Sequence, residues 1–467
     1  MKLFLIQLGE MVPAQVDVAR MLKKNHEIQY WVRMENHFAV YREEFEGTFF
    51  QDYLDAIQGI PARGIDLYKY EPWSAHDIAA YGDIESEYMT MADKLHPHWS
   101  VNQRKDLYFD LLRYWGGILD EFKPDCIVIL GVPHHEYDFV LYKIAKRRGI
   151  RTIILENTFR GGRYVLYEDY TVGSEKFLIG NGARETTLEQ LSPEMRAYFE
   201  RVSLGENPAP PYVQAFHERR TTINAIRRWN HAIVRFIKDR SLFERAILKV
   251  LKMMKPSLKD EHHANEKAPN FDNSYAYFPL HYQPEFTTSP AGGLYVDQMH
   301  AIKTIAAALP EGWELYVKEH PGQLAVHGGN FTPARYSGFY SAIVAIPHVR
   351  LVPLETNTYK LIDRARTTAT IAGTAGWESI LRGKTALVLG YPWYLQAPGV
   401  LRVSSVPECR NAFEKITGGF VPRQSDILSY LDRVDQASLY GDLLYIKTDT
   451  PQYAQDMYTA IEEMLAS

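Results

Sequence analysis

The sequence has little cysteine and no long apolar run. Only Cys126 and Cys409 occur among its 467 residues. Two cysteines cannot build a disulfide framework, and so few thiols fit a reducing compartment. No stretch approaches the roughly 18 consecutive apolar residues of a membrane-spanning helix. The first residues, MKLFLIQLGEM, have too short an apolar run for a signal peptide. We therefore expect a cytoplasmic protein.

Several nucleotide-binding and metal-binding motifs are also missing. The sequence has no G-x-G-x-x-G and no Walker loop, so neither an NAD enzyme nor an ATPase is supported. It has no D-x-D, no H-E-x-x-H and no Cys/His spacing for zinc, so we expect no metal and no bound cofactor. The net charge of −5 argues against a general nucleic-acid-binding protein.

The overall composition is that of a globular protein with more than one domain. Hydrophobic residues make up 46% of the chain and charged residues 23%, which is typical of soluble proteins. A chain of 467 residues is too long for one ordinary core. The aromatic content of 13% is dominated by 31 tyrosines, which suit either sugar-binding surfaces or a tyrosine-rich core. We expect two or three domains.

The first half of the chain contains a predicted βαβ unit. A buried strand over 125–130 is followed by the loop GVPHHEYD, a helix over 139–148 and a strand over 152–155. This order over about thirty residues predicts parallel strands with a right-handed crossover. His134, His135 and Asp138 follow the first strand, and Glu156 and Asn157 follow the second. Each group alone is compatible with a solvated loop, but together they favour a binding cleft at the strand ends.

The middle of the chain is basic and proline-bounded. Between residues 216 and 259 there are twelve Lys and Arg against three Asp and Glu. A basic amphipathic helix pair can lie on an anionic membrane surface or bind an anionic acceptor, and a solvated helical face is the alternative. We assign a helical insertion to about 205–260, and the polar stretch 259–273 is predicted to be a linker.

The second half alternates regularly between strands and helices. Strands are predicted at 275–280, 314–318, 349–352, 368–371 and 385–389, with helices between them. This pattern predicts a second doubly wound α/β domain. The predicted division is an N-terminal domain over 1–265, a C-terminal domain over 266–450, and a last helix over 451–467 that packs back on the first domain.

Three strand ends in the second half carry the candidate chemistry. Pro321 favours an extended conformation for His320 at the end of one strand. A second strand end, IAGTAGWE, has glycines that allow close approach of a ligand and a helix start that favours phosphate. There Thr374 adds a hydroxyl donor, and Glu378 can accept from ribose hydroxyls. The third, LHYQPE, offers Glu285, which can pair with Glu156 of the other domain in glycosyl chemistry. Solvated strand ends, a tight glycine turn and unrelated surface glutamates are the alternatives.

With these residues identified, the chain resembles bacterial capsule polysaccharide biosynthesis proteins. This group of GT-B glycosyltransferases includes the retaining Kdo transferases of capsule and lipopolysaccharide assembly. The matching segments are LHYQPE at 280–285, VKEHP at 317–321 and GTAGWESILRGKTALVLG at 373–390. The resemblance implies two Rossmann-type doubly wound domains that face each other across a cleft. It covers about 275–400 strongly, and PHHEYD and LEN look like the counterpart loops of the first half.

The resemblance also implies roles for individual residues. His320, with Pro321 after it and Lys318 nearby, contacts the CMP part of the donor. Gly373, Thr374 and Ala375 bind its phosphate, with Glu378 and Gln283 on the same donor side. Glu285 takes the place of the nucleophile, where aspartate is more usual, and Glu156 is the candidate acid/base. The loop residues on the acceptor side are His134, His135, Asp138 and Asn157.

The sequence therefore favours a metal-independent glycosyltransferase. We expect it to move a CMP-activated ulosonic acid, such as Kdo or a sialic-acid-like relative, onto a bacterial surface glycan or glycolipid, with retention. The basic segment 216–259 would hold the enzyme at the inner membrane face. One alternative is a GT-B transferase that uses UDP or another nucleotide sugar. The other is a non-catalytic capsule-assembly protein of the same fold.

Overall fold

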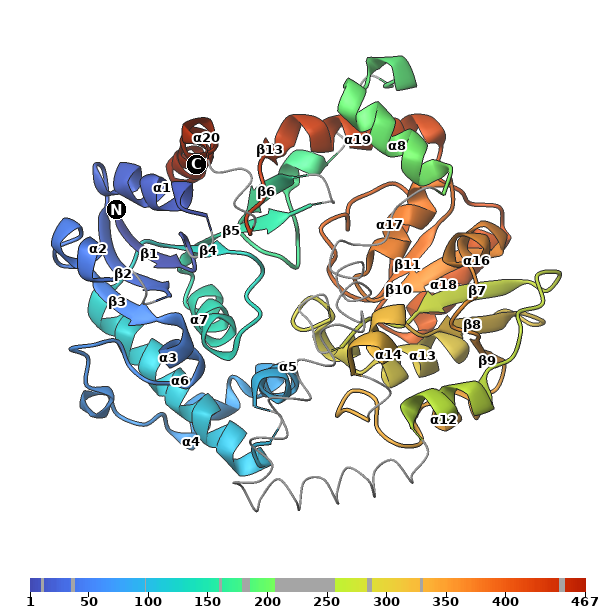
Figure 1. Cartoon of the computed structure of the whole chain (residues 1–467), viewed down its shortest axis with the longest axis horizontal. Coiled ribbons are helices and arrows are strands. Elements are labelled where there is room, and N and C mark those ends of the chain that lie inside the picture. Colours follow the sequence, from blue (N-terminus) through green and yellow to red (C-terminus); the bar gives the residue numbers. More distant parts are fainter. Residues whose placement is uncertain are drawn as a thin grey trace, which may run out of the picture.

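The protein consists of two α/β units placed side by side (Figure 1). The computed structural model describes residues 1–9, 12–34, 38–96, 98–158, 162–178, 185–205, 257–283, 288–327, 331–444 and 450–467. Each unit is built on its own sheet, one of seven strands and one of six. Both sheets have parallel cores, which gives the chain the two-domain α/β architecture of the GT-B fold.

The first sheet has a parallel core and an antiparallel edge. Its order is β13-β6-β5-β4-β1-β2-β3. The strands from β5 to β3 in this order are parallel, whereas β6 pairs antiparallel with β5 and β13 antiparallel with β6. The strands are β1 (Lys2–Ile6), β2 (Glu27–Arg33), β3 (Phe49–Asp52), β4 (Cys126–Leu130), β5 (Arg151–Asn157), β6 (Arg163–Tyr167) and β13 (Leu439–Tyr440).

Helices cover both faces of the first sheet because its strands are apolar on both sides. Along β1, Phe4 and Ile6 belong to the core beneath α5, α6 and α7, whereas Leu3 and Leu5 belong to the core beneath α1 and α20. Parallel strands buried on both faces have this composition. The helices of this unit are α1 (Ala14–Lys23), α2 (Phe38–Glu44), α3 (Tyr53–Ile57), η2 (Leu67–Lys69), α4 (Ala75–Ala79), α5 (Gly82–Leu95), α6 (Val101–Phe122), α7 (Glu136–Arg147) and α20 (Pro451–Ala466).

The second sheet is entirely parallel. Its order is β12-β11-β10-β7-β8-β9, the doubly wound arrangement of a nucleotide-binding fold. The strands are β7 (Tyr275–Pro279), β8 (Glu314–Lys318), β9 (Val349–Val352), β10 (Thr367–Thr370), β11 (Ala386–Val388) and β12 (Val400–Arg402). The expected strands at 314–318 and 349–352 have these bounds, and the other three expected strands differ by a residue at one or both ends.

The helices of the second unit also cover two faces. Buried side chains of α13, α15 and α18 pack with one face of the sheet, and those of α16 with the other. The helices and short turns are η3 (Glu175–Phe177), η4 (Leu188–Gln190), α8 (Pro193–Ser203), α12 (Leu258–Asn265), η5 (Gly293–Val296), α13 (Gln298–Ala306), α14 (Pro321–His327), α15 (Phe339–Val344), α16 (Thr358–Arg364), α17 (Thr374–Leu381), α18 (Val406–Thr417) and α19 (Gln424–Ala437).

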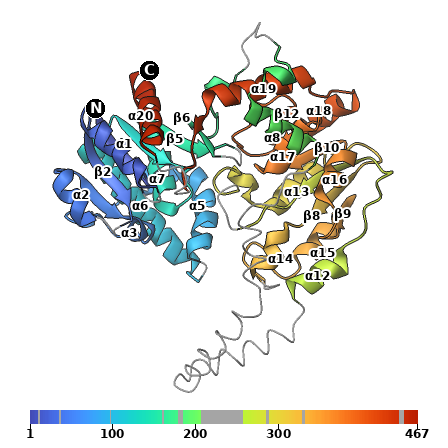
Figure 2. The same cartoon turned by 45° about the horizontal axis from the view of Figure 1, so that its top comes forward.

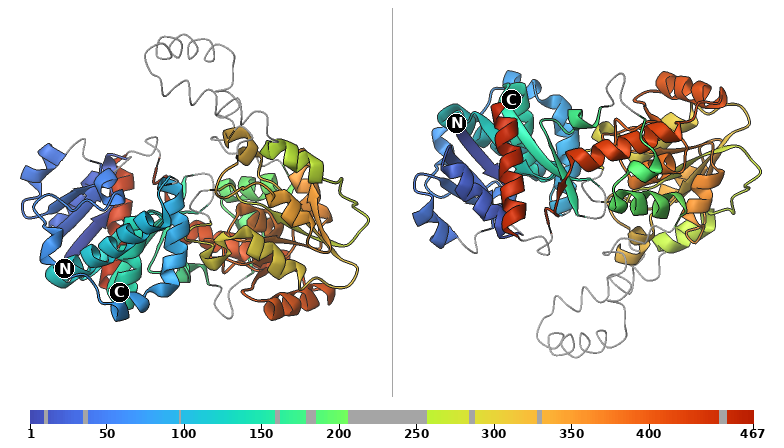
Figure 3. Two further views of the ribbon diagram at one scale, coloured as in Figure 1. Left: turned by 90° about the horizontal axis from the view of Figure 1, so that it is seen from below. Right: turned by 90° about the horizontal axis from the view of Figure 1, so that it is seen from above.

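The chain crosses between the units more than once. α8 lies on the second unit, where Trp377 Nε1 donates to Tyr198 Oη at 2.8 Å. After α19 the chain returns: β13 joins the first sheet, and α20 packs on α1 beside the N-terminus (Figures 2 and 3). Both α8 and α12 thus pack in the second unit, and the predicted division of the chain at residue 265 stays a prediction. The expected linker 259–273 contains most of α12, which packs with α15 through Glu261, the acceptor for the Tyr340 amide.

Two further expectations concern membranes. None of the helices in the described parts of the chain is long and apolar enough to cross a membrane. Residues 216–256, which make up nearly all of the basic segment, lie outside the described residues. Its proposed contact with an anionic surface stays a prediction from the sequence.

Candidate active site between the two sheets

Each sheet has one point where the direction of winding reverses. In the first sheet this point lies between β1 and β4, and in the second between β7 and β10. Ligands of open α/β sheets bind outside the carboxyl ends of the strands at such points, because the loops on either side diverge there. The residues that follow these four strands are therefore the first candidates for the site.

At the first switch point, Gln7 contacts three residues that follow β4. Its Nε2 lies 3.0 Å from His135 Nδ1, 2.8 Å from Tyr137 Oη and 2.9 Å from Asp138 Oδ2. Gln7 has a positive φ of 63°, which turns the chain sharply out of β1. Asp138 Oδ1 accepts from the His135 amide at 2.8 Å and caps α7. The cluster thus brings together His135 and Asp138, as the sequence predicted from their loop, around a residue that it did not identify.

This cluster carries no net charge below about pH 7. The contact of 3.1 Å between His135 Nδ1 and Asp138 Oδ2 requires one proton. Burial lowers the pKa of His135 to about 3 and raises the pKa of Asp138 to about 7. The proton therefore belongs to Asp138 through most of the range below pH 7. His134 lies beside His135, with 4.0 Å between ring centroids and the rings tilted by 43°, and burial lowers the pKa of His134 to about 3 as well.

The ligand atoms of His134, His135 and Asp138 lie within 4.8 Å of one another, close enough to surround a metal ion. Both nitrogens of His135 already have hydrogen-bond partners, however. Nδ1 contacts Gln7 and Asp138, and Nε2 lies 2.8 Å from Tyr53 Oη. Metal binding would require these bonds to be exchanged. The donor set therefore fits a hydrogen-bond network better than a metal site.

Two glutamates of the first unit also have pKa values near neutrality. Burial raises the pKa of Glu136 to about 8, and neither of its carboxylate oxygens has a hydrogen-bond partner among the described residues. Glu156, at the end of β5, is half-buried and accepts from Tyr167 Oη, and burial raises its pKa to about 7. A carboxyl with a pKa near 7 can both donate and accept a proton under working conditions.

Asn157 has a different setting from the other predicted residues of this unit. Its Nδ2 donates to Asp442 Oδ1 at 3.3 Å, and its Oδ1 accepts from the Leu443 amide at 3.3 Å. These bonds tie the end of β5 to the segment that returns from the second unit. The Asn157 side chain thus links β5 to the chain segment that crosses back from the second unit. Its proposed role in acceptor binding stays a prediction.

In the second unit, a buried ion pair organises the loops after β7 and β8. Arg335 and Glu319 are both fully buried, and Arg335 Nε donates to Glu319 Oε2 at 2.6 Å. Tyr340 Oη donates to the same oxygen at 2.7 Å. Burial opposes ionisation of Glu319, but the charge and hydrogen bonds of Arg335 outweigh it and hold the Glu319 pKa below its usual value. Glu319 is thus an internal ion-pair partner, where a solvated strand end was the alternative.

Gln283 joins the two ends of the loop that leaves β7. Its Nε2 donates to Val296 O at 2.9 Å and to Thr288 Oγ1 at 3.2 Å. Its backbone amide donates to Gln323 Oε1 at 2.9 Å, so the loop is also attached to α14. Gln283 is buried, which places its contacts inside the protein. The candidate nucleophile Glu285 lies outside the described residues.

His281 occupies the second switch point. Its Nε2 lies 3.3 Å from Thr370 Oγ1 and accepts from the Ala372 amide at 3.4 Å. A Cβ at Gly373 would lie only 2.8 Å from the same nitrogen. Gly373 has an ordinary φ of −82°, so a close approach explains this glycine and backbone conformation does not. Burial lowers the pKa of His281 to about 3.

The predicted nucleotide contacts lie on either side of His281. His320 is half-buried just before Pro321, the first residue of α14, and its Nδ1 accepts from the Gly322 amide at 3.1 Å. His320 lies close enough to His281 for its charge to lower the His281 pKa further. On the other side, Gly373 precedes α17. The ends of β7, β8 and β10 thus bring His320, His281 and Gly373 close together.

Lys318 lies at the same end of β8 but on the other face of the sheet from Glu319, since successive strand residues alternate. Its Nζ donates to Thr358 Oγ1 at 2.8 Å, and the side chain is only 5% exposed. Burial lowers its pKa to about 8. Lys318 is therefore still mainly a cation at pH 7, with an environment that favours contact with an anion.

The turn into α17 presents an unblocked helix N-terminus. No side chain of the described residues caps it, and the first-turn amides of any helix lack internal acceptors. Thr374 is exposed, and Ala375 and Glu378 are half-buried on the same helix. The Gly373 amide donates to Thr370 Oγ1 at 3.1 Å, which fixes the turn. Such a turn can bind a phosphate through backbone N–H groups.

A cavity of about 520 Å³ lies between the two units. Lys94 on its first-unit side is close enough to act on the pKa values of His134, His135, Glu136 and Asp138. Gln283 and Gln298 line its second-unit side. The cavity thus connects the surroundings of both switch points. Its lining residues are Met89, Thr90, Met91, Asp93, Lys94, Arg104, Gln283, Thr288, Ser289, Val296, Asp297, Gln298, Met299, Lys303, Pro333, Ala334, Tyr336 and Phe339.

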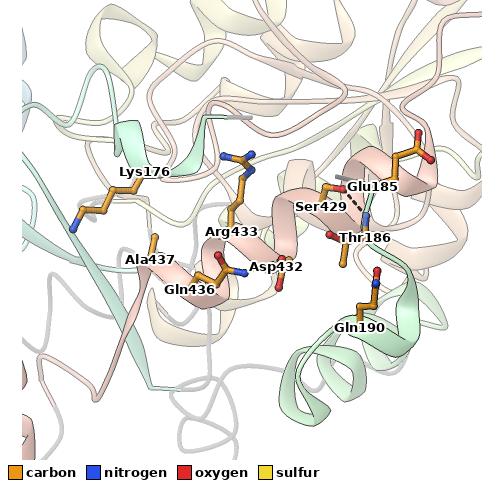
Figure 4. Close-up of a pocket in the computed structure, with 9 residues that line it drawn as sticks. All are labelled: Lys176, Glu185, Thr186, Gln190, Ser429, Asp432, Arg433, Gln436 and Ala437. Atoms are coloured by element: carbon orange, nitrogen blue, oxygen red, sulfur yellow. Dashed lines mark hydrogen bonds between the residues drawn. The ribbon is translucent and has the colours of Figure 1, made fainter. Parts of the chain in front are cut away.

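Another groove runs along α19 and the segment that precedes α8 (Figure 4). The Thr186 amide donates to Ser429 Oγ at 3.0 Å across it. Its charges are mixed, because Lys176 and Arg433 line it together with Glu185 and Asp432. None of its lining residues follows a strand of either parallel core. We therefore place the candidate site at the interdomain cavity.

Sequence reasoning missed the residues that position the others. Gln7 follows a predicted strand, and the switch-point rule applied to that strand would have found it. Glu136 lies inside the PHHEYD loop motif but was not singled out. Arg335 stands in an irregular loop far from any motif, and no pattern in the sequence marks it.

The comparisons with known proteins were as follows. Residues 288–415 match the family described as "Capsule polysaccharide biosynthesis protein", which confirms the family resemblance. No curated protein matches the chain significantly. Among solved structures, the β-Kdo 2,7-transferase KpsC of Thermosulfurimonas dismutans is 12% identical, with 84% of this chain and 97% of that chain covered and a TM-score of 0.29. A UDP-GlcNAc 2-epimerase from Methanocaldococcus jannaschii is 12% identical, with coverage of 93% and 99% and a TM-score of 0.25.

Proposed function

We propose that this chain, whose residues 288–415 belong to the capsule polysaccharide biosynthesis family, is a glycosyltransferase. It transfers a CMP-activated ulosonic acid, such as Kdo or a sialic-acid-like sugar, to a bacterial surface-glycan acceptor with retention. The observation that carries this proposal is that His320, His281 and Gly373 lie close together at the second switch point. That position is where doubly wound sheets bind nucleotides. We call the side on which His320, Lys318 and the Gly373 turn would meet the donor the nucleotide surface.

The donor lies against the second unit in this proposal. His320 contacts the cytidine part, and the amides at Gly373, Thr374 and Ala375 hold the phosphate. Lys318 supplies positive charge from the neighbouring strand end, and Glu378 accepts from the ribose. Gln283 contributes by holding the β7 loop in place. A nucleoside monophosphate is a stable leaving group, so the proposal includes no metal ion.

The acceptor enters from the first unit. His134, His135 and Asp138 lie close to Lys94, which lines the cavity, and Asn157 follows the neighbouring strand. Glu156 acts as acid/base, which its pKa of about 7 supports. Glu285 is the proposed nucleophile, on the loop whose ends Gln283 joins.

Nucleotide-dependent thermal stabilisation tests the donor. Ligands that bind only the folded protein raise its melting temperature. CMP should raise it and UDP should not. Stabilisation by UDP alone would contradict the CMP donor and favour the rival transferase that uses another nucleotide sugar.

Turnover separates an enzyme from a non-catalytic assembly protein. The wild-type protein should release CMP from a CMP-sugar in the presence of acceptor. Replacement of Glu285 by Gln should abolish this, whereas replacement of His320 by Ala should mainly weaken donor binding. Wild-type rates in both variants would show that the site is misplaced. Absence of both nucleotide binding and CMP release in the wild type would favour the assembly role.

The basic segment 216–259 is proposed to hold the cytoplasmic enzyme at the inner membrane face, near a lipid-linked acceptor. Flotation with vesicles containing anionic phospholipids tests this. The intact chain should float with anionic vesicles and not with neutral ones. A chain without residues 216–259 should not float with either kind of vesicle. Equal flotation of both chains would refute the membrane contact.

A further inference from the structure

Arg335 makes more contacts than an ion pair needs. All five of its N–H groups have acceptors in three separate segments. Nε and Nη2 bind the Glu319 carboxylate at 2.6 and 3.1 Å, and Nη2 also donates to His281 O at 3.0 Å. Nη1 donates to Gln283 Oε1 at 3.2 Å and to Ala334 O at 2.9 Å. A planar fork of this kind fixes the direction of each partner, which a point charge cannot do.

The partners of Arg335 belong to the proposed site. Glu319 precedes His320, and its Oε1 accepts from the His320 amide at 2.7 Å. His281 and Gln283 lie on the loop after β7, and Gln283 lines the interdomain cavity. The guanidinium also lies 4.6 Å from the ring centroid of Phe339, another lining residue. The Arg335 guanidinium therefore contacts Glu319, which holds the His320 amide, and also residues that line the interdomain cavity.

We propose that Arg335 is a positioning residue that holds His320 and the β7 loop in the arrangement required for donor binding. The inference rests on the proposed function, since it assumes a nucleotide at His320. Arg335 would act through Glu319 and Gln283 without touching the ligand.

The hydrogen-bond network allows positioning to be separated from folding. Each acceptor of Arg335 outside its own loop has a second donor. Gln298 Nε2 donates to Gln283 Oε1 at 2.6 Å and to His281 O at 3.2 Å. Tyr340 and the His320 amide serve the two oxygens of Glu319. Replacement of both charged partners, in Glu319→Gln with Arg335→Met, therefore leaves no buried charge and few unsatisfied groups. Neutral replacement of a buried ion pair is often tolerated.

The experiment measures CMP and UDP binding by calorimetry for the wild type, the paired variant Glu319→Gln/Arg335→Met, and Arg335→Lys. The matched control is Glu314→Gln/Arg350→Met, which removes a partly exposed pair at the opposite end of β8. Melting temperatures confirm folding. We expect the paired variant to stay folded and to bind CMP about 10-fold to 100-fold more weakly, as small displacements of binding groups do. Arg335→Lys should lie between it and the wild type, and the control should bind normally.

The outcomes separate the inference from the proposed function. A folded paired variant with wild-type CMP affinity overturns the positioning role and leaves the donor assignment intact. If the wild type binds UDP and not CMP, and the paired variant no longer binds UDP, the positioning role of Arg335 is supported and the assignment of CMP as the donor nucleotide is refuted. A wild type that binds neither nucleotide overturns both. If the paired variant does not fold, Arg335→Lys decides, since wild-type affinity in that variant also overturns the role.

Discussion

The two switch points differ in how their buried polar side chains are stabilised. Both place buried polar side chains at the carboxyl ends of parallel strands. At the first, Gln7, His135 and Asp138 share hydrogen bonds without a net charge below about pH 7, because burial keeps the histidine neutral and the carboxyl protonated in that range. At the second, Arg335 and Glu319 are both charged and every donor of the guanidinium is used.

This difference suggests different tasks. Groups that titrate near neutral pH suit proton transfer, and the first unit has three carboxyls with pKa values of about 7 to 8. A fully satisfied ion pair holds loops rigidly and exchanges no protons. We therefore associate acceptor activation with the first unit and nucleotide positioning with the second.

The largest expected effect is loss of one charge from the second cluster. Arg335→Met leaves the buried Glu319 carboxylate without its counter-charge, and removal of one partner of a buried pair costs about 3–5 kcal/mol. Asp138→Asn in the first cluster should cost at most about 1 kcal/mol, since Asn resembles the protonated carboxyl. Denaturant unfolding measures both. Equal losses would show that the clusters do not differ in charge as described.

The second prediction concerns pH. The folded pKa of Glu136, about 8, exceeds its unfolded value, so the folded state holds an extra proton between about pH 4.5 and 8. The contribution of Glu136 to stability should therefore fall by about 2 kcal/mol between about pH 6.5 and 8, and Asp138 and Glu156, with pKa values of about 7, act in the same direction. The histidines with lowered pKa values act in the opposite direction, but only below about pH 6.5. In the second unit, the lowered pKa values of His281 and Glu319 make stability rise with pH only below about pH 6.5, and the lowered pKa of Lys318, about 8, makes it rise only from about pH 8 upward.

Hydrogen exchange in α7 and β8 reports on the two units separately. Amide protection in α7 should decline as the pH rises from 6.5 to 8. This decline should be smaller in Glu136→Gln and unchanged in the exposed control Glu43→Gln. An equal fall of amide protection in α7 and β8 between pH 6.5 and 8 would contradict the difference between the units.

A third prediction tests whether Lys318 belongs to the nucleotide surface. Lys318→Met removes a buried cation, and CMP binding should weaken about tenfold, equivalent to about 1.4 kcal/mol. In the wild type, CMP affinity should fall as the pH rises through about 8, because Lys318 then loses its charge. Calorimetry at pH 7 and pH 9 provides the test. An affinity independent of pH in this range would remove Lys318 from the site.

The smallest expected effect is at the phosphate turn. Thr374→Val keeps the shape of the side chain and removes one hydroxyl, so CMP binding should weaken by about 0.5–1.5 kcal/mol. Thr374→Ser should restore it, and the exposed Thr417→Val should change nothing. If Thr374→Val binds CMP as the wild type does, the phosphate contact is made by backbone amides alone.

The sequence predicted the regular elements better than the contacts between them. β8 and β9 have the expected bounds because each is a short apolar segment between turn residues, and periodicity is a local signal. His320 and Gly373 could be selected because a proline or a glycine marks them. Gln7 could have been selected because it follows a predicted strand, although its partners lie 128 to 131 positions away in the chain. Arg335 could not, since its partners outside its own loop lie 16 to 54 positions away and no motif marks it. The same limit applies to the domain boundary, which depends on where α8 packs.

A crystal structure of the protein with CMP tests the central claim most directly. The account predicts that the cytidine contacts His320 and that the phosphate lies at the N-terminus of α17, beside Gly373 and Thr374, with Arg335 still bound to Glu319. CMP bound in the groove along α19, or at the first switch point beside His135 and Asp138, would contradict it.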